Sequence, residues 1–100
     1  MSAVCHVVLV SWKRGAGGSA EQVIRPAARG FVDSIPGVVA VSEGPSSSAE
    51  GLEDGYDYGL VVTFASGPAR DAYLDDPQYV PVAEAIRAAA ERIVVFDIDM

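Results

Sequence analysis

The strands predicted in this chain are apolar on both faces. The clearest runs are residues 5–10, 59–64 and 93–96. Successive side chains of a strand point to opposite faces, so a sheet with one face in water alternates apolar and polar residues. A chain of 100 residues has enough helical sequence to cover only one face. We therefore expect the other face to meet a second copy of the chain in a homodimer. The residues expected to face that partner are Cys5, Val7, Leu9 and Val61.

The predicted elements follow one another as strand, helix, strand, strand, helix and strand, with the second helical region divided near Leu74. Right-handed crossovers and paired neighbouring strands favour a four-stranded antiparallel sheet with the helices on one face. This is the ferredoxin-like β-α-β-β-α-β arrangement, an α+β fold, and we expect residues 1–100 to form one domain. The predicted strands cover residues 4–12, 38–43, 56–64 and 93–99, and the predicted helices cover residues 19–34, 66–74 and 76 onward.

Capping residues and prolines predict where the helices begin. Ser19 and Gln22 fit a capping box at the start of the first helix. Pro26 removes a backbone donor inside that helix, which predicts a kink there or a later start. Asp76, followed by a proline, predicts the start of the last helix, and Pro81 should distort its first turn.

The charge and composition of the chain exclude several kinds of partner. It carries 7 Lys and Arg against 14 Asp and Glu, a formal net charge of −7. Such a surface repels phosphate backbones and anionic lipids, and the basic residues are scattered, so we expect no nucleic-acid partner. No apolar run approaches the roughly 20 residues of a membrane span, so we expect no membrane partner. A single cysteine and an N-terminus without a signal-peptide pattern predict a cytoplasmic protein.

The motifs that could bind a cofactor or a metal have simpler explanations. Residues 15–20 fit G-x-G-x-x-A, which can cradle a pyrophosphate, but the chain is too short for a dinucleotide-binding fold. Cys5 and His6 are neighbours on one strand and point to opposite faces, so they cannot act as a pair within a subunit. One histidine and no cysteine cluster leave only carboxylates for a metal, and we expect Asp97 and Asp99 to be solvated. The sequence thus predicts no metal and no cofactor.

The lone histidine and several tyrosines are predicted to converge on one apolar space between the sheet and the helices. Strand parity and the apolar stripe of the last helix bring them together. An apolar space with a few convergent polar groups is the usual form of a small-molecule site. The alternative is an ordinary core in which the histidine and the tyrosines are hydrogen-bonded. The candidate catalytic residues are His6, Tyr73 and Tyr79, and the candidate ligand-binding residues are Val8, Val10, Ile24, Tyr58, Leu60, Leu74 and Val82.

Several short segments spread along the chain form a recognisable set. They are residues 6–10 and 12–13 (HVVLV and WK), 35–38 (IPGV), 50–52 (EGL), 55–57 (GYD), 62–64 (VTF), 73–77 (YLDDP) and 94–97 (VVFD). Taken in this order, they resemble the stress-responsive A/B barrel (Dabb) family. The resemblance implies a ferredoxin-like subunit and a dimer whose two sheets pack into an α+β barrel, which agrees with the argument from the two-faced strands.

The resemblance also implies a chemistry for the apolar space. One member type of the family, a polyketide cyclase of the olivetolic acid kind, closes a linear polyketide by aldol chemistry without a cofactor. Its first-strand histidine and a later tyrosine match His6 and Tyr73. Its His-Pro-x-His segment reads Asp76-Pro77-Gln78-Tyr79 here, so Tyr79 stands where the cyclase has its base. A tyrosine with the ordinary pKa of about 10 is a poor base at neutral pH.

Three functions stay open at this point. The first is a cofactor-free cyclase or isomerase acting on a small hydrophobic or polyketide-like ligand. In it His6 moves a proton, and Tyr73 and Tyr79 donate hydrogen bonds to an enolate oxygen. The second is a non-catalytic ligand-binding or stress-associated protein in which those residues are core. The third, by analogy of fold, is a cofactor-free monooxygenase. An open cavity that reaches His6 would favour an enzyme, and a filled core would favour the second function.

Overall fold

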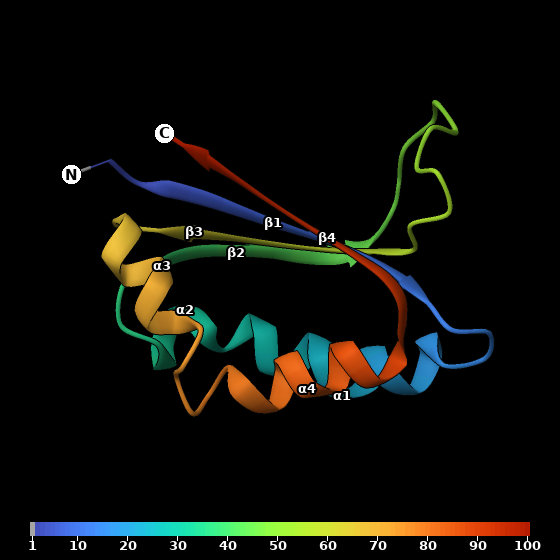
Figure 1. Cartoon of the computed structure of the whole chain (residues 1–100), viewed down its shortest axis with the longest axis horizontal. Helices are drawn as coiled ribbons and strands as arrows, with labels where there is room; N and C mark the ends of the chain where they lie inside the picture. The colour runs from blue at the N-terminus through green and yellow to red at the C-terminus, as the bar shows by residue number, and fades with distance from the viewer. Residues whose placement is uncertain (1) are drawn as a thin grey trace.

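A computed structural model describes residues 2–100. Its strands and helices follow one another in the order that the sequence predicts. The elements are β1 (Val4–Trp12), α1 (Gly17–Arg29), α2 (Phe31–Ser34), β2 (Val38–Pro45), β3 (Tyr58–Phe64), α3 (Gly67–Tyr73), α4 (Val80–Ala89) and β4 (Ala90–Asp99). The strands form one antiparallel sheet in the order β2-β3-β1-β4. Figure 1 shows α1 and α4 against one face of this sheet, with α3 at one end. The predicted ferredoxin-like α+β fold is confirmed. None of the helices in the described part is long and apolar enough to cross a membrane.

One face of the sheet packs on the helices and forms the core. In β3 and most of β1, buried side chains occupy alternate positions, as the period of two along a strand requires. The helices bury residues on the side that faces the sheet, among them Ile24 of α1 and Ile86 of α4. The strand residues buried in this core are Val4, His6, Val8, Val10, Trp12, Val38, Tyr58, Leu60, Val62 and Phe64.

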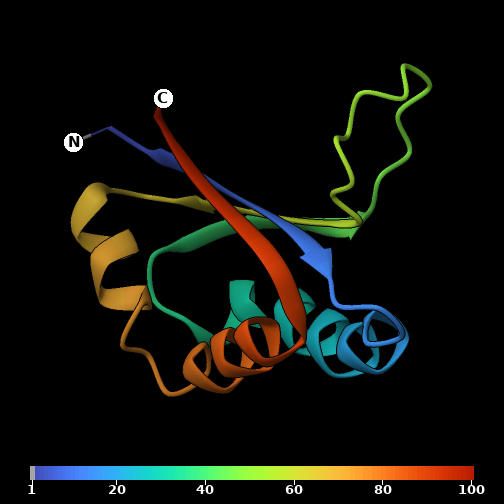
Figure 2. The same ribbon diagram turned by 45° about the vertical axis from the view of Figure 1, so that its right-hand side comes forward.

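The opposite face of the sheet is open, and we call it the open face. It carries the residues of opposite parity in β1 and β3, of which Leu9 is 36% exposed. The register between β1 and β4 places Val94 opposite Leu9 and Phe96 opposite Val7, so β4 adds large exposed side chains to this face. In Figures 1 and 2 no helix covers it. The face that the sequence assigns to a partner is thus uncovered within one subunit.

The start and the interruption of α1 differ from the prediction. Ser19 lies inside α1, whose N-cap is Ala16 without a side-chain hydrogen bond, so the predicted capping box is wrong. The reason is a tertiary contact, because a Cβ at Gly17 would lie 2.6 Å from Cδ1 of Trp12. A glycine therefore lets the helix begin close under the end of β1. The helix also continues through Pro26 to Arg29, and the chain changes direction at the following glycine instead.

The start of α4 also differs from the prediction. The residue pair 76–77 does not begin the helix, because Asp76 accepts a hydrogen bond from the backbone N–H of Gln78 at 2.8 Å and closes a turn. The helix begins at Val80. Pro81 falls in its first turn, where the missing N–H breaks no helical hydrogen bond, so this position accommodates a proline.

Candidate functional site

His6 and Asp97 lie directly opposite each other on β1 and β4, so both side chains belong to the helix-covered face. The Nδ1 atom of His6 lies 2.6 Å from Oδ1 of Asp97. An ionised carboxylate can only accept a hydrogen bond, so Nδ1 carries the proton and Nε2 keeps the lone pair that can take one up. The His6 side chain is 5% exposed and the Asp97 side chain 28%. The contact with Asp97 holds the His6 imidazole in one orientation, at the boundary between the core and the solvent.

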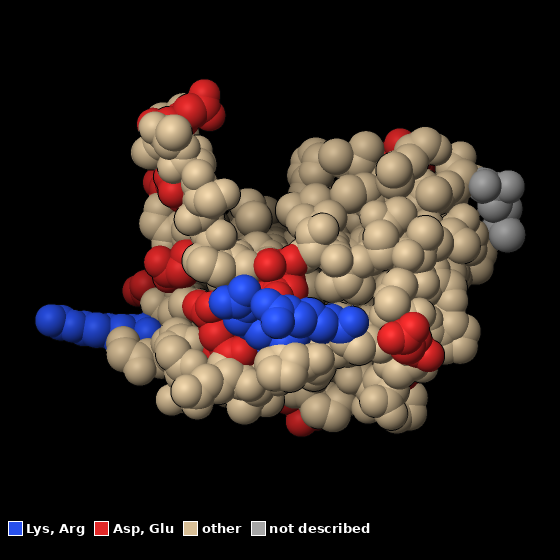
Figure 3. Space-filling view, turned by 180° about the vertical axis from the view of Figure 1, so that it is seen from behind, with Lys and Arg blue, Asp and Glu red and all other residues tan. Residues whose placement is uncertain are grey.

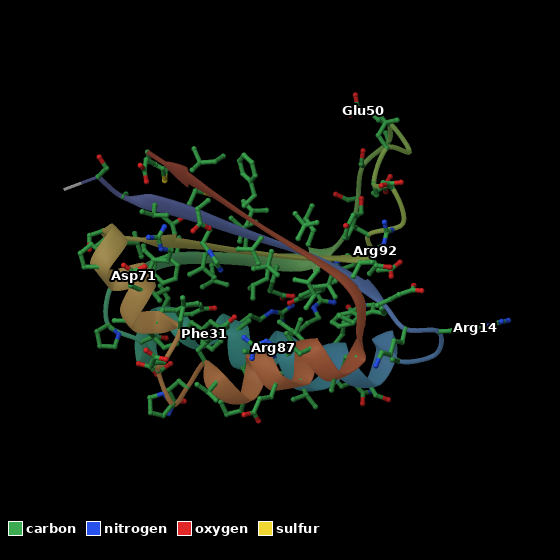
Figure 4. All side chains as sticks on the ribbon, in the orientation of Figure 1. Arg14, Phe31, Glu50, Asp71, Arg87 and Arg92 are labelled. Atoms are coloured by element: carbon green, nitrogen blue, oxygen red, sulfur yellow. The ribbon has the colours of Figure 1, made fainter. Side chains whose placement is uncertain are left out.

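Aromatic rings surround the His6 imidazole. Its centroid lies 5.9 Å from that of Phe64 and 6.1 Å from that of Tyr73, both in edge-on contact. Tyr73 stacks on Tyr79 at 4.0 Å and meets Phe31 edge-on at 5.7 Å. Figure 4 shows Phe31 between the sheet and the helices, at the end of the molecule where α3 lies. The structure thus brings the three predicted catalytic residues into one contiguous cluster.

The hydroxyl of Tyr73 is a buried polar atom of this cluster without a hydrogen-bond partner. It is fully buried and makes no hydrogen bond to any of residues 2–100. A buried polar group in this state costs free energy, and native structures contain few of them. Burial raises the pKa of Tyr73 far above its ordinary value, and burial also raises the pKa of Tyr79. Both phenols therefore stay protonated at neutral pH and can donate a hydrogen bond but cannot act as bases.

Asp97 joins the site to α3. Its Oδ2 accepts a hydrogen bond from Nη1 of Arg70 at 3.0 Å, while its Oδ1 faces His6. Hydrogen bonds to Asp71 and Asp97 raise the pKa of Arg70, Asp71 having the larger effect. The expectation that Asp97 is simply solvated is therefore wrong. Its pairing with His6 follows from the register of β4 against β1, which spans 91 positions of sequence and cannot be read from either segment alone.

The predicted ligand-binding residues fall into three places. Five of them are buried between the sheet and the helices, as the strand parity and the apolar stripes of the helices predict. Leu74 follows α3 and is 48% exposed. Tyr58 is buried but lies at the other end of β3, opposite Val10 and beside Trp12, with ring centroids 5.6 Å apart. The five core residues are Val8, Val10, Ile24, Leu60 and Val82, none more than 5% exposed.

A second polar cluster, which we call the Glu43 cluster, surrounds Tyr58. Glu43 of β2 accepts hydrogen bonds from Nε of Arg25 at 2.8 Å, Nε of Arg29 at 2.9 Å and the hydroxyl of Tyr58 at 3.2 Å. Burial acts to raise the pKa of Glu43, but the hydrogen bonds from Arg29, Arg25 and Tyr58 together outweigh it and lower the pKa. Burial, with Glu43 nearby, raises the pKa of Tyr58 far above its ordinary value. Figure 3 shows basic side chains gathered beside acidic ones on the side facing away from the viewer in Figure 1.

The open face carries a hollow of about 390 Å³. Leu9, Gly59 and Val61 form its floor, and the connection between β2 and β3, residues 46–57, rises beside it as a wall (Figure 2). Arg92 holds this wall against β4, since its guanidinium lies 4.7 Å from the centre of the Tyr56 ring and donates a hydrogen bond to the backbone of the wall. The hollow and His6 lie on opposite faces of the sheet. Within residues 2–100, no group of three or more His, Cys, Asp or Glu could hold a metal ion.

Solved structures share this fold over almost the whole chain. A dimeric ferredoxin-like protein of unknown function from Jannaschia sp. CCS1 is 22% identical, with a TM-score of 0.89, and the match covers 98% of this chain and 99% of that one. The Arabidopsis thaliana protein At3g17210 is 28% identical, with a TM-score of 0.81 and coverage of 97% and 94%. The hydroxynitrile lyase from Passiflora edulis is 20% identical, with a TM-score of 0.85 and coverage of 99% and 94%. No curated protein matches the sequence at a significant level.

The family comparison agrees with this fold and with the motifs of the sequence. The model of the stress responsive A/B barrel domain, Dabb, matches residues 4–100. That match begins with the strand that carries His6 and ends beyond the strand that carries Asp97. The chain therefore belongs to the Dabb family.

Proposed function

We propose that this protein is a cofactor-independent enzyme that transfers a proton on a small carbonyl compound, with His6 as the base. The observation that carries the proposal is the 2.6 Å contact between Nδ1 of His6 and Asp97. That contact fixes the tautomer in which Nε2 accepts a proton, and the carboxylate stabilises the imidazolium that results. Imidazole is the side chain best suited to this step near neutral pH.

The buried Tyr73 hydroxyl supplies the second part of the proposed mechanism. When a proton leaves the carbon next to a carbonyl, negative charge develops on the carbonyl oxygen. A protonated, desolvated phenol with no partner of its own can donate to that oxygen without first giving up another hydrogen bond. Tyr79, stacked on Tyr73, would line the same space. The hydroxynitrile lyase with this fold is an enzyme, which supports an enzymatic role here.

The proposed reaction requires that a substrate can reach His6. His6, Tyr73 and Tyr79 are at most 9% exposed, and their rings are in contact. A substrate therefore needs these rings to move apart before it can reach His6. A small hydrophobic or polyketide-like compound is the ligand class that such an aromatic space would accept.

The tight packing of the same rings favours a second candidate function. A filled core with a hydrogen-bonded histidine is what a non-catalytic ligand-binding or stress-associated protein would have. The two candidates differ in whether His6 changes the rate of any reaction.

Solvent deuterium exchange separates the two candidates. A panel of enolisable carbonyl compounds, including 1,3-diketones and linear polyketide mimics, is incubated in D2O with the protein, and deuterium uptake is followed by mass spectrometry. At least one compound should exchange faster than its background rate. His6→Gln should lower that excess rate by about 10²–10⁴-fold. Glu50→Gln is the control, because Glu50 lies in the exposed connection between β2 and β3, far from α3 (Figure 4), and should leave the rate unchanged.

Two results would contradict the enzymatic proposal. One is the absence of exchange for every compound of the panel with the native protein. The other is a His6→Gln variant that exchanges at the native rate. If in either case a compound still raises the Tm of the protein, the non-catalytic candidate is supported.

We also propose that the working form is a homodimer joined through the open face, with a cytoplasmic location and a single Dabb domain. The apolar residues of this face and of β4 would be covered by the partner, and several proteins with this fold are described as dimeric. Leu9→Glu would bury an unpaired charge, which costs several kcal/mol (~3 kcal/mol or more), and should yield monomer or unfolded chain in sedimentation. Val23→Glu, at a 61% exposed apolar position of α1, is the control and should sediment as the native protein does. A stable Leu9→Glu dimer would show that the partner binds elsewhere.

A further inference from the structure

We infer that Arg70 is a positioning residue for His6, acting through Asp97. Arg70 holds the carboxylate so that one oxygen stays on Nδ1 of His6, and its positive charge limits how strongly the imidazole retains a proton. This inference rests on the proposed proton-transfer function, and it assigns a part of that mechanism to a residue that does not touch the histidine.

The geometry divides the two oxygens of Asp97 between two partners. Oδ1 lies on Nδ1 of His6 at 2.6 Å, and Oδ2 lies on Nη1 of Arg70 at 3.0 Å. A carboxylate held from both sides cannot rotate without breaking one contact. The guanidinium is held in turn, because its Nη2 and Nε lie 3.0 and 3.1 Å from Oδ1 of Asp71. The orientation of the imidazole therefore depends on a chain of charged contacts that ends on α3.

The same helix also holds the histidine ring itself. Arg70 and Tyr73 are three positions apart on α3, so they project from one side of the helix. One of them reaches the carboxylate, and the other packs edge-on against the imidazole. Figure 4 shows Asp71 on α3 at this end of the molecule. Movement of α3 would therefore break both contacts at once.

The charges around His6 decide how readily it gives its proton away. Asp97 and Asp99 lie on the same face of β4, and Arg70, Asp71 and the neutral Tyr73 come from α3. A carboxylate alone favours the protonated imidazole, whereas a nearby guanidinium disfavours it. A base that must be neutral before each cycle benefits from a partner that offsets part of the carboxylate charge. Arg70 is the cation in contact with that carboxylate.

The titration of His6 tests this role directly, because the chain contains one histidine and its ring signals are unambiguous. The midpoint of the ring titration is measured by NMR in the folded protein. Arg70→Met should move the midpoint upward relative to the native protein, because it removes the positive charge in contact with Asp97. Asp97→Asn should move it downward, and Arg70→Lys should keep it close to the native value. Arg14→Met is the control, because Arg14 extends into solvent at the other end of the molecule (Figure 4).

The outcomes separate this inference from a structural role and from the proposed function. If Arg70 only stabilises α3, Arg70→Met lowers the Tm but leaves the midpoint equal to that of Arg14→Met, and the inference is overturned. If the midpoint moves as expected while no compound exchanges deuterium with the native protein, the positioning role stands and the proposed reaction does not. If Arg70→Lys retains the deuterium exchange rate that Arg70→Met loses, both the positioning role of Arg70 and the proposed reaction are supported.

Discussion

Two tyrosines lie near carboxylates at opposite ends of β3, and they differ in how far their hydrogen bonds are satisfied. At one end, the hydroxyl of Tyr58 donates to Glu43, whose oxygens also accept from two arginines. At the other end, the hydroxyl of Tyr73 has no partner within the described residues, although the ring of His6, which is paired with Asp97, lies 6.1 Å from the Tyr73 ring. Complete pairing is typical of a structural cluster, whereas a buried donor left open is available to a ligand. The comparison predicts that one end supports the fold and the other serves function.

The largest effect should follow from removing the centre of the Glu43 cluster. Glu43→Ala leaves two guanidinium groups and one phenol without their acceptor. Arg29 is mostly exposed and can turn to water, so we expect a loss of about 2–3 kcal/mol in the free energy of unfolding, below the usual cost of breaking a fully buried pair. Urea unfolding of Glu43→Ala measures this loss.

Glu53→Ala is the matched control for that substitution. Glu53 is a carboxylate of the wall beside the hollow, and its hydrogen bond to Ser46 is exposed. Its removal should change stability by less than about 0.5 kcal/mol. Equal losses in the two variants would show that the Glu43 cluster is no more structural than an exposed surface pair.

A pair of tyrosine variants tests the two ends against each other. Tyr58→Phe removes a hydroxyl that donates to Glu43, and it should cost about 1 kcal/mol. Tyr73→Phe removes a buried hydroxyl without a partner, so the variant should be as stable as the native protein or slightly more stable. Thermal and urea unfolding of both variants give the two values. A larger loss in Tyr73→Phe than in Tyr58→Phe would reverse the assignment of the two ends.

The smallest effect concerns acid stability. The pKa of Glu43 is lowered by its arginine partners, so its stabilising contribution is present above the ordinary pKa of 4.5 and is lost as the pH falls through the lower folded value. The native protein should therefore lose more stability between about pH 6 and about pH 3 than Glu43→Gln does. Urea midpoints across this range measure the slope. Parallel slopes in the two proteins would mean that Glu43 has the same pKa folded and unfolded.

The sequence predicts the architecture well because the architecture depends on local periodicity. Apolar residues on both faces of the strands and the order of the elements suffice for the sheet, its helix-covered side and its open face. Parity alone places His6 on the helix side and Leu9 on the open face. Ser66 caps α3, and a serine directly before a glycine and a proline is a local sequence signal for the start of a helix. These features need no knowledge of contacts between distant segments.

The parts of the site that sequence reasoning misses all depend on such contacts. Asp97 looks like a solvated residue near the C-terminus until the register of β4 places it on His6. Arg70 and Glu43 look like surface charges until α3 and α1 are docked on the sheet. The false helix start at Ser19 has the same cause, since the close approach of Trp12 to Gly17 decides where α1 begins. The register of the strands and the docking of the helices depend on contacts across the whole fold, so a local sequence pattern does not predict them.

The position of β4 at the edge of the sheet has a consequence for solubility. Its outer backbone groups are unpaired, and half of its side chains are large and apolar, which makes such a strand a template for aggregation with other chains. Asp97 and Asp99 interrupt this run with negative charges, as natural edge strands commonly do. A substitution of Asp97 by an apolar residue would therefore endanger the monomeric chain during synthesis as well as the orientation of the histidine. One carboxylate thus has two physical roles, since it orients the histidine and also places a charge in an apolar edge strand.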